Sequence, residues 1–272
     1  MHTAPAEIPT AAARVRRVER RPFPAERRLV IAAERAGRHM TPMHGLVEFD
    51  VTDARRLLAE HDPPLSFTAF LIASVARAAA AHPDVHAYRD WRGRVVTHQH
   101  VDVATLVEIE TPGGPFPLAH LVRDADVRSV ADLSEELRTV KRSPRRSRSG
   151  DLLVRFRRVA VHTPGLVPIL TATYRVAARS VRAHRITGTI ALTSVGMFGG
   201  GNGFGIAEPT LLSLQVVVGG ISRQPRAVDG HTRLRDVLDL TITLDHNVVD
   251  GAPAARFGKD LRSLVESAAV LR

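Results

Sequence analysis

A strand that leads directly into a helix, beginning at Leu238, constrains the fold of this chain more than any other stretch. Apolar residues alternate with aspartate and threonine over residues 238–245, which is the pattern of a strand with one buried face. Asp250 then occupies a helix N-cap position, and Pro253 suits the first helical turn. His246 lies at the junction, where two rigid elements can hold an imidazole in one orientation, as a general base requires.

The same residues also have an ordinary structural interpretation. A histidine just past a strand is commonly a surface residue, and an aspartate before a helix is commonly only a cap. Spacing alone favours that interpretation, because short motifs discriminate weakly. Against it, Asp250 follows His246 closely enough to order the turn or to orient the imidazole. The small residues Gly251, Ala252 and Ala254 leave room for a ligand or a neighbouring chain.

Two longer motifs resemble those of a known family. DHNVVDGAPAARF, residues 245–257, resembles the H-x-x-x-D-G motif of the chloramphenicol acetyltransferase-like acyltransferases. It is most similar to the pattern DHRVVDGA-x-AARF in the catalytic domain of the dihydrolipoamide acyltransferases of 2-oxo acid dehydrogenase complexes. GTIALTSVGMFG, residues 188–199, resembles that family's GTFTISNLGMFG. The resemblance covers roughly residues 25–140 and 188–272, and it is loose in the first third of the chain.

The resemblance implies a fold that periodicity alone does not give. Patterning predicts only alternating helices and strands, with helices over residues 25–36, 52–61, 67–82 and 130–140 and strands over 42–50, 101–107, 189–195 and 211–221. The family implies an α/β fold with a mixed β-sheet faced by helices. It also implies a trimeric building block, so we expect a homotrimer or a larger assembly built of trimers.

The family motifs also assign roles to individual residues. His246 is implied to be the general base, Asp250 to hold the loop or the imidazole, and Thr193 to stabilise the tetrahedral intermediate with its hydroxyl. In the family the histidine and the hydroxyl residue come from different subunits. The implied supporting residues are Ser194, Gly251 and Arg27. Arg27 is a candidate ion-pair partner for Asp250 or a solvated helix charge, and Thr193 and Ser194 also fit ordinary strand positions.

The composition limits the chemistry and the partners. The 272 residues include no cysteine, which excludes disulfides, thiolate metal sites and a cysteine nucleophile, so an acyl thioester must lie on a cofactor or a partner. The net charge of +10 suits a polyanion, and the supply of only two tyrosines and one tryptophan favours coenzyme A over nucleic acid. We expect no metal, no membrane span and no signal peptide. The absence of cysteine fits a reducing cytosol, so we expect a cytoplasmic location.

The chain divides into an arm and one domain by composition. Residues 1–22, rich in Ala, Pro and Arg, predict a flexible N-terminal arm, and residues 23–272 predict the catalytic domain. Within it, residues 141–187 contain a basic linker and an apolar segment that departs from the family pattern. That segment fits a helical hairpin packed on the domain, an interfacial basic helix or a contact between subunits. We expect no covalent lipoyl site in this chain, so a lipoyl domain would be supplied in trans.

These observations lead to one main functional hypothesis and three others. The main one is an acyltransferase that moves an acyl group between coenzyme A and a thiol acceptor, with His246 as base. The replacement of the family's arginine by Asn247 leaves open a CoA-dependent enzyme acting on a small-molecule acceptor. A catalytically silent trimeric scaffold is a further alternative. A binder of nucleic acid or membrane surfaces is disfavoured, because aromatic residues and groove-reading motifs are lacking.

Overall fold

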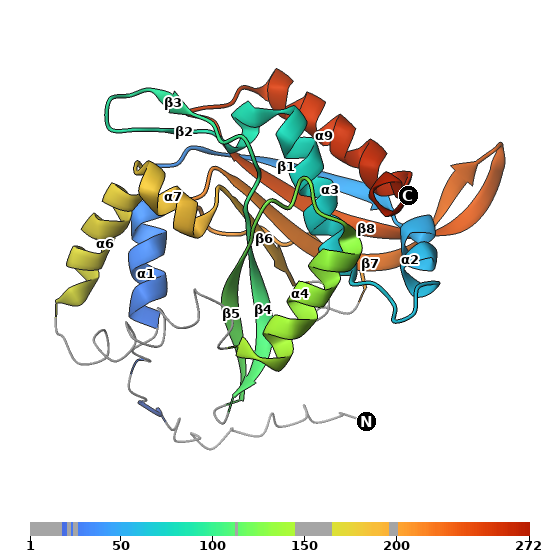
Figure 1. The fold of residues 1–272 in the computed structure, drawn as a ribbon, viewed down its shortest axis with the longest axis horizontal. Coiled ribbons are helices and arrows are strands. Elements are labelled where there is room, and N and C mark those ends of the chain that lie inside the picture. Colours follow the sequence, from blue (N-terminus) through green and yellow to red (C-terminus); the bar gives the residue numbers. More distant parts are fainter. Residues whose placement is uncertain (1–17, 21–22, 24–26, 112–113, 145–164, 196–200) are drawn as a thin grey trace, which may run out of the picture.

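The computed structural model describes residues 18–20, 23, 27–111, 114–144, 165–195 and 201–272. In this part of the chain a mixed β-sheet carries a layer of helices on one face, and two further helices lie side by side at one end (Figure 1). Most of the predicted N-terminal arm and much of the basic linker lie outside the described residues.

The sheet contains six strands in the order β1-β8-β7-β6-β4-β5. Its strands are β1 (Pro42–Asp50), β4 (Val103–Thr111), β5 (Gly114–Val122), β6 (Ile190–Ser194), β7 (Leu214–Val228) and β8 (His231–Asp245). β6 pairs in parallel with both β4 and β7, and the other pairs are antiparallel. A separate short hairpin is formed by β2 (Tyr88–Arg89) and β3 (Val95–Val96).

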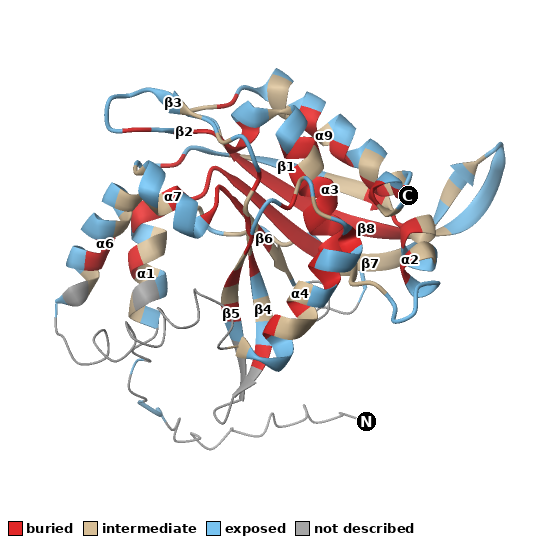
Figure 2. Ribbon diagram, viewed as in Figure 1, coloured by how far each residue is buried: buried red, intermediate tan, exposed pale blue. Residues whose placement is uncertain are grey.

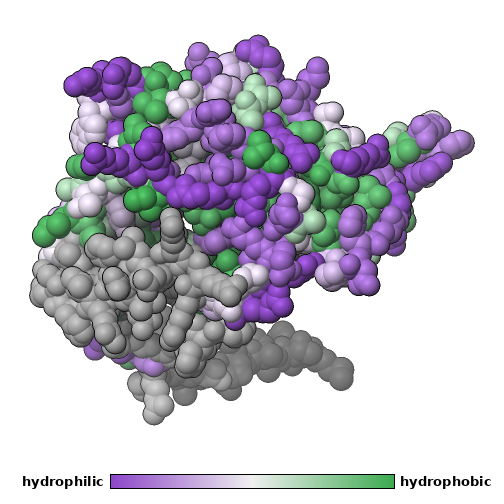
Figure 3. Space-filling model, in the orientation of Figure 1, coloured by the Kyte–Doolittle hydropathy of each residue, from purple (hydrophilic) through white to green (hydrophobic). Residues whose placement is uncertain are grey.

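Four of the helices described below pack on one face of the sheet. The α-helices are α1 (Arg27–Gly37), α2 (Thr52–Ala59), α3 (Phe67–Ala81), α4 (Val130–Arg142), α6 (Leu166–Ala177), α7 (Val181–Thr187) and α9 (Gly251–Glu266). Two short 3-10 turns are η1 (Pro83–His86) and η3 (Ala269–Leu271). The layer on the sheet consists of α2, α3, α4 and α9, whose outer surface is largely hydrophilic (Figure 3).

α3 forms the centre of the core because its sequence is apolar on nearly every side. Its residues from Ala69 to Ala76 are all buried, and it lies between the sheet and the other helices (Figure 2). The Ser66 side chain caps its start by accepting a hydrogen bond from the Ala69 amide at 3.3 Å. Phe257 and Leu261 on α9 complete the same core with no exposed surface, as their helical spacing predicts.

The expectation that β8 is buried on only one face is wrong. Leu238, Leu240 and the following even-numbered residues face the helices, but Asp239, Thr241 and Thr243 are also buried. The backbone around Gly203 lies on this second face, where the Gly203 amide donates to Asp239 Oδ2 at 2.6 Å. A second pair on the same face joins Thr243 Oγ1 to His44 Nδ1 at 2.9 Å. The alternation in the sequence therefore reports a polar interior face, which a strand pattern cannot distinguish from a solvated one.

Most predicted elements are present, with one notable extension. The four predicted helices correspond to α1, α2, α3 and α4, and the predicted strands correspond to β1, β4, β6 and the first half of β7. β7 continues to Val228 because it resumes pairing with β8 after a bulge at Gly219–Gly220. Side chains at these glycines would collide with the backbone of Gly201 and Gly203, so the glycine-rich segment packs directly on the bulge.

The segment that the sequence was expected to set apart from the family pattern is helical where the structure describes it. α6 and α7 occupy residues 166–187, and α6 packs along α1 (Figure 1). Arg175 Nη2 donates to the Arg35 carbonyl at 3.5 Å. This agrees with a helical element packed on the domain. The predicted domain boundaries and a contact between subunits through this segment stay predictions.

A buried histidine beneath the β2–β3 hairpin predicts how stability depends on pH. His86 has no exposed surface, its Nδ1 bonds Thr189 Oγ1 at 2.8 Å, and its Nε2 has no hydrogen-bond partner among the residues that the structure describes. Burial lowers the pKa of His86 to about 4, so the unfolded chain takes up a proton at a higher pH than the folded chain. Stability contributed by the neutral ring is therefore present near neutral pH and is lost as the pH falls from 6.5 toward 4.

We expect His86→Gln to flatten this pH dependence. Between pH 7 and pH 5 the native protein should lose about 2 kcal/mol through this one residue, and the variant should not. Urea unfolding at the two pH values measures the difference, with the exposed-site variant His61→Gln as the control. An unchanged pH dependence in His86→Gln would contradict the assignment.

Candidate active site

His246 lies where the end of β8 meets the residue before β1. Its backbone amide donates to the Thr41 carbonyl at 2.8 Å, and the Val248 and Val249 amides both donate to the Asp245 carbonyl. The chain therefore makes a tight turn that leaves the imidazole about half exposed, at 47% of its free surface. This is the rigid junction that the strand–helix sequence predicts.

The imidazole is oriented by a backbone carbonyl. Its Nδ1 lies 2.9 Å from the Val249 carbonyl oxygen, which can only accept a hydrogen bond. Nδ1 therefore carries the proton in the neutral ring, and Nε2 presents a free lone pair. A neutral histidine with this tautomer is prepared to remove a proton from a bound group.

The Asp250 side chain does not form the capping hydrogen bond that the sequence pattern predicts. It occupies the N-cap position of α9, but its side chain makes no capping hydrogen bond and is 89% exposed. Its Oδ1 lies 3.8 Å from Nδ1 of His246, which is too long for a hydrogen bond. The Asp250 backbone carbonyl, not the carboxylate, begins the helix by accepting from Ala254. At this exposure the carboxylate adds only a weak, screened attraction for the imidazolium.

The expected pairing of Arg27 with Asp250 is not formed within one protomer. In the part of the chain that the structure describes, no ion pair joins the two side chains. Arg27 begins α1, whereas Gly37 at the other end of α1 contacts Pro209 near the His246 turn. An eleven-residue helix is about 16 Å long, so Arg27 lies at the far end from the candidate base.

Sequence reasoning missed the pair that holds the turn, Asp245 and Asn247. Asp245 Oδ1 accepts from the Thr41 amide at 3.2 Å, the Asn247 amide at 3.0 Å and Asn247 Nδ2 at 2.8 Å. Asn247 Nδ2 also donates to the His39 carbonyl at 3.2 Å, and its Oδ1 accepts from Thr41 Oγ1 at 3.2 Å. An aspartate bonding the amide two residues on is an Asx turn, and that local pattern was the available signal.

Thr193 lies on β6, far from His246 in the same chain. The register places it beside Val217 and, one strand further, beside Thr241. Two strand spacings and the five residues from Thr241 to His246 separate the two positions by about 19 Å. Alternation along β6 places Ser194 on the helix-covered face, together with Leu192. Thr193 therefore lies on the opposite face. His246 and Thr193 of one protomer are therefore too far apart to contact the same reacting carbonyl group.

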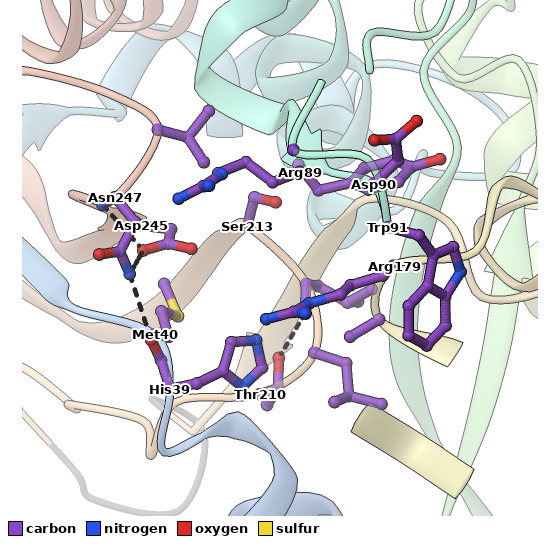
Figure 4. A pocket seen from close by; sticks show the side chains of 16 residues that line it. His39, Met40, Arg89, Asp90, Trp91, Arg179, Thr210, Ser213, Asp245 and Asn247 are labelled. Carbon is purple, nitrogen blue, oxygen red and sulfur yellow. Dashed lines mark hydrogen bonds between the residues drawn. The ribbon is translucent and has the colours of Figure 1, made fainter. Parts of the chain in front are cut away.

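A pocket opens beside the His246 turn (Figure 4). Its volume is about 280 Å³, and it is bounded by the β2–β3 hairpin, the α6–α7 turn, the segment before β7 and the residues that flank His246. The side chains that line it include Arg89, Trp91, Arg179, Asp245 and Asn247. Residue spacing gave no signal of this pocket, because its walls come from parts of the sequence that only the fold brings together.

Two other properties follow from a survey of the described residues. They contain no group of three histidine, aspartate or glutamate side chains arranged to hold a metal ion. None of the helices described here has the length and apolar character needed to cross a membrane.

A family model for the 2-oxoacid dehydrogenases acyltransferase (catalytic domain) matches residues 26–155 and 160–271. The chain belongs to this family. The resemblance of the two sequence motifs is thereby confirmed, and so is the predicted α/β fold with its mixed sheet and covering helices.

Individual relatives in the family are distant in sequence. The chain is 24% identical over 210 residues to the dihydrolipoyllysine-residue acetyltransferase component of the pyruvate dehydrogenase complex of Mycoplasma pneumoniae, covering 77% of this chain and 43% of that protein. The corresponding component of Corynebacterium glutamicum is 23% identical over 249 residues, covering 88% of this chain and 31% of that protein. The chain thus spans less than half the length of these relatives.

Solved structures show the same fold. The dihydrolipoamide acetyltransferase of Azotobacter vinelandii superposes with a TM-score of 0.69 at 19% identity, covering 99% of this chain and 100% of that one. A structure of the cubic core of a pyruvate dehydrogenase multienzyme complex gives a TM-score of 0.66 at 20% identity, with 99% and 100% coverage. At these identities the agreement concerns the fold.

The hydrogen bonds of Asp245 predict a local stability effect. Asp245→Ala removes one acceptor from three N–H donors, so we expect the free energy of unfolding to fall by about 1–3 kcal/mol. Asp245→Asn keeps an oxygen at the same place and should retain most of that stability. Chemical denaturation of the two variants measures the difference. Equal losses in both would show that the charge, not the acceptor geometry, stabilises the turn.

Proposed function

We propose that this chain is an acyltransferase that moves an acyl group between coenzyme A and a thiol acceptor, a dihydrolipoyl group carried by a partner protein. The observation that carries the proposal is the half-exposed His246 whose Nδ1 is bonded to the Val249 carbonyl, which leaves Nε2 free to accept a proton. The acetyltransferase and succinyltransferase names of its relatives support this reaction class.

The proposed reaction begins with proton removal. His246 Nε2 takes the proton of the incoming thiol, and the thiolate attacks the carbonyl carbon of the acyl thioester. A carbon–sulfur bond forms, and negative charge develops on the carbonyl oxygen of a tetrahedral intermediate. The Thr193 hydroxyl of a neighbouring subunit donates a hydrogen bond to that oxygen. Collapse of the intermediate breaks the original carbon–sulfur bond, and the departing thiolate takes the proton back from the imidazolium.

The proposal requires an assembly in which one chain supplies the base and the next supplies the hydroxyl. The separation of about 19 Å between His246 and Thr193 in one protomer supports this requirement. A closed ring of subunits joins such unlike surfaces head to tail, and a trimer is the smallest ring that the family resemblance offers. We therefore propose a homotrimer or a larger assembly built of trimers. A lipoyl domain from a partner and a cytoplasmic location also belong to this proposal.

Two alternatives make different predictions for the same protein. A CoA-dependent enzyme with a small-molecule acceptor would bind coenzyme A but would not acylate dihydrolipoamide. A silent scaffold would assemble without binding coenzyme A at all. The intact His246 geometry favours an enzyme, because a scaffold has no need of an oriented imidazole with a free lone pair.

The first experiment measures acetyl transfer from acetyl-CoA to free dihydrolipoamide. We expect the wild-type chain to be active and His246→Ala to be slower by about 1,000-fold, because the base is lost. Light scattering should show the same assembly for both proteins. The matched control is His231→Ala, which removes an exposed histidine at the start of β8 and should leave the rate unchanged. Full activity in His246→Ala would contradict the mechanism.

A complementation experiment tests whether each site uses two chains. Thr193→Val alone should lower the rate by about 100- to 1,000-fold, through loss of the oxyanion donor. When His246→Ala and Thr193→Val chains are co-expressed equally, random ring assembly should restore roughly a quarter of the wild-type activity, because some sites receive both intact residues. Rings of either variant alone are the controls. No recovery in verified mixed rings would show that the two residues do not meet between subunits.

A further inference from the structure

The pocket beside His246 has two arginines that no described carboxylate neutralises. Arg89 lies at the end of β2, and Arg179 lies in the turn between α6 and α7. Figure 4 shows both side chains extending into the pocket, Arg89 toward Asp245 and Asn247 and Arg179 toward His39. Neither guanidinium forms an ion pair with any residue that the structure describes. Two guanidinium groups facing one cavity repel each other unless an anion lies between them.

The two carboxylates in the pocket wall are already bonded elsewhere. Asp90 accepts from the amides of Arg92 and Arg94, each at 2.9 Å, and from the Arg94 guanidinium. Asp245 Oδ1 accepts three N–H groups within its own turn. Asp90 is thus neutralised by Arg94, whereas the donors to Asp245 are neutral and leave its charge in the wall. The two arginines together exceed that single carboxylate charge by one, and this excess positive charge favours an anionic ligand.

The rest of the lining fits a small organic anion. The side chain of Trp91 is 56% exposed and presents a flat apolar surface at the edge of the pocket. Thr210 and Ser213 add hydroxyl groups to the wall. A volume of about 280 Å³ is near the lower end of the range for small-molecule sites. Arginine is suited to this role because its planar fork binds phosphate or carboxylate oxygens in pairs.

The pocket adjoins the turn that carries His246. Asp245, Asn247 and Val248 form part of its wall, and these residues lie immediately before and after His246. His246 itself does not line the pocket. Arg179 lies within residues 160–271, which the family model matches, so the expected departure of this segment from the family pattern is wrong.

We propose that Arg89 and Arg179 bind an oxyanion of the acyl donor, either a phosphate of its nucleotide or a carboxylate at the end of its acyl chain. This inference rests on the proposed function for the identity of the donor. The pocket would then determine which donor is accepted, and the reacting thioester would lie at His246.

Trp91 provides a direct reporter because it is the only tryptophan in the chain. We expect inorganic phosphate or succinate, titrated at constant ionic strength, to change the tryptophan fluorescence in a saturable way that chloride does not reproduce. Arg89→Gln and Arg179→Gln should each weaken that binding about tenfold, as expected for loss of a charge-assisted hydrogen bond. Arg92→Gln is the matched control, because Arg92 lies in the same hairpin but does not line the pocket. A response unchanged in both variants, or no saturable response in the wild type, would overturn the proposal.

Steady-state kinetics with two donors then identify the source of the oxyanion. If the pocket binds a nucleotide phosphate, both variants should raise KM for acetyl-CoA and for succinyl-CoA alike. If it binds an acyl carboxylate, only KM for succinyl-CoA should rise. Unchanged KM for both donors would overturn the assignment to the donor. The fluorescence titration does not depend on turnover. A protein that is inactive but shows arginine-dependent anion binding would contradict the proposed reaction and still support the proposed anion site.

Discussion

The carboxylate of Asp245 joins the end of β8 to the residues that precede β1, and the functional part of the structure depends on this connection. One oxygen accepts three N–H groups, so the turn that follows has a single arrangement. That arrangement places the Val249 carbonyl against His246 Nδ1 and thereby sets the tautomer of the ring. It also fixes Asn247 against the His39 carbonyl, which makes the turn one wall of the pocket.

The polar second face of the sheet connects this turn to the rest of the site. Asp239 binds the Gly203 amide and holds the glycine-rich segment that follows β6 onto the bulge in β7. Thr193 lies on the same face, two strands from Thr241 in the register of the sheet. Among the described residues, Asp239 Oδ1 and Thr241 Oγ1 are buried there without hydrogen-bond partners, which costs stability.

Several elements could be predicted residue by residue because their signals are local. The Ser66 cap, the apolar α3 and the helical spacing of Phe257 and Leu261 each specify an element through contacts within a few residues. The burial of Asp239 could not be predicted in the same way, because a solvated face and a polar interior face give the same alternation. The side-chain role assigned to Asp250 as a cap failed for a related reason, since a cap residue needs only its backbone to begin a helix.

The family, the strand–turn–helix at His246 and the separate strand that carries Thr193 could all be read from the amino-acid sequence. These depend on short-range periodicity and on motifs that are contiguous in the chain. Three relations come from the folded structure alone: Val249 orients the imidazole, Thr193 and His246 are about 19 Å apart in one protomer, and Arg89 and Arg179 line one pocket. Those relations depend on sheet register and on the packing of distant segments, and no interval along the chain encodes them.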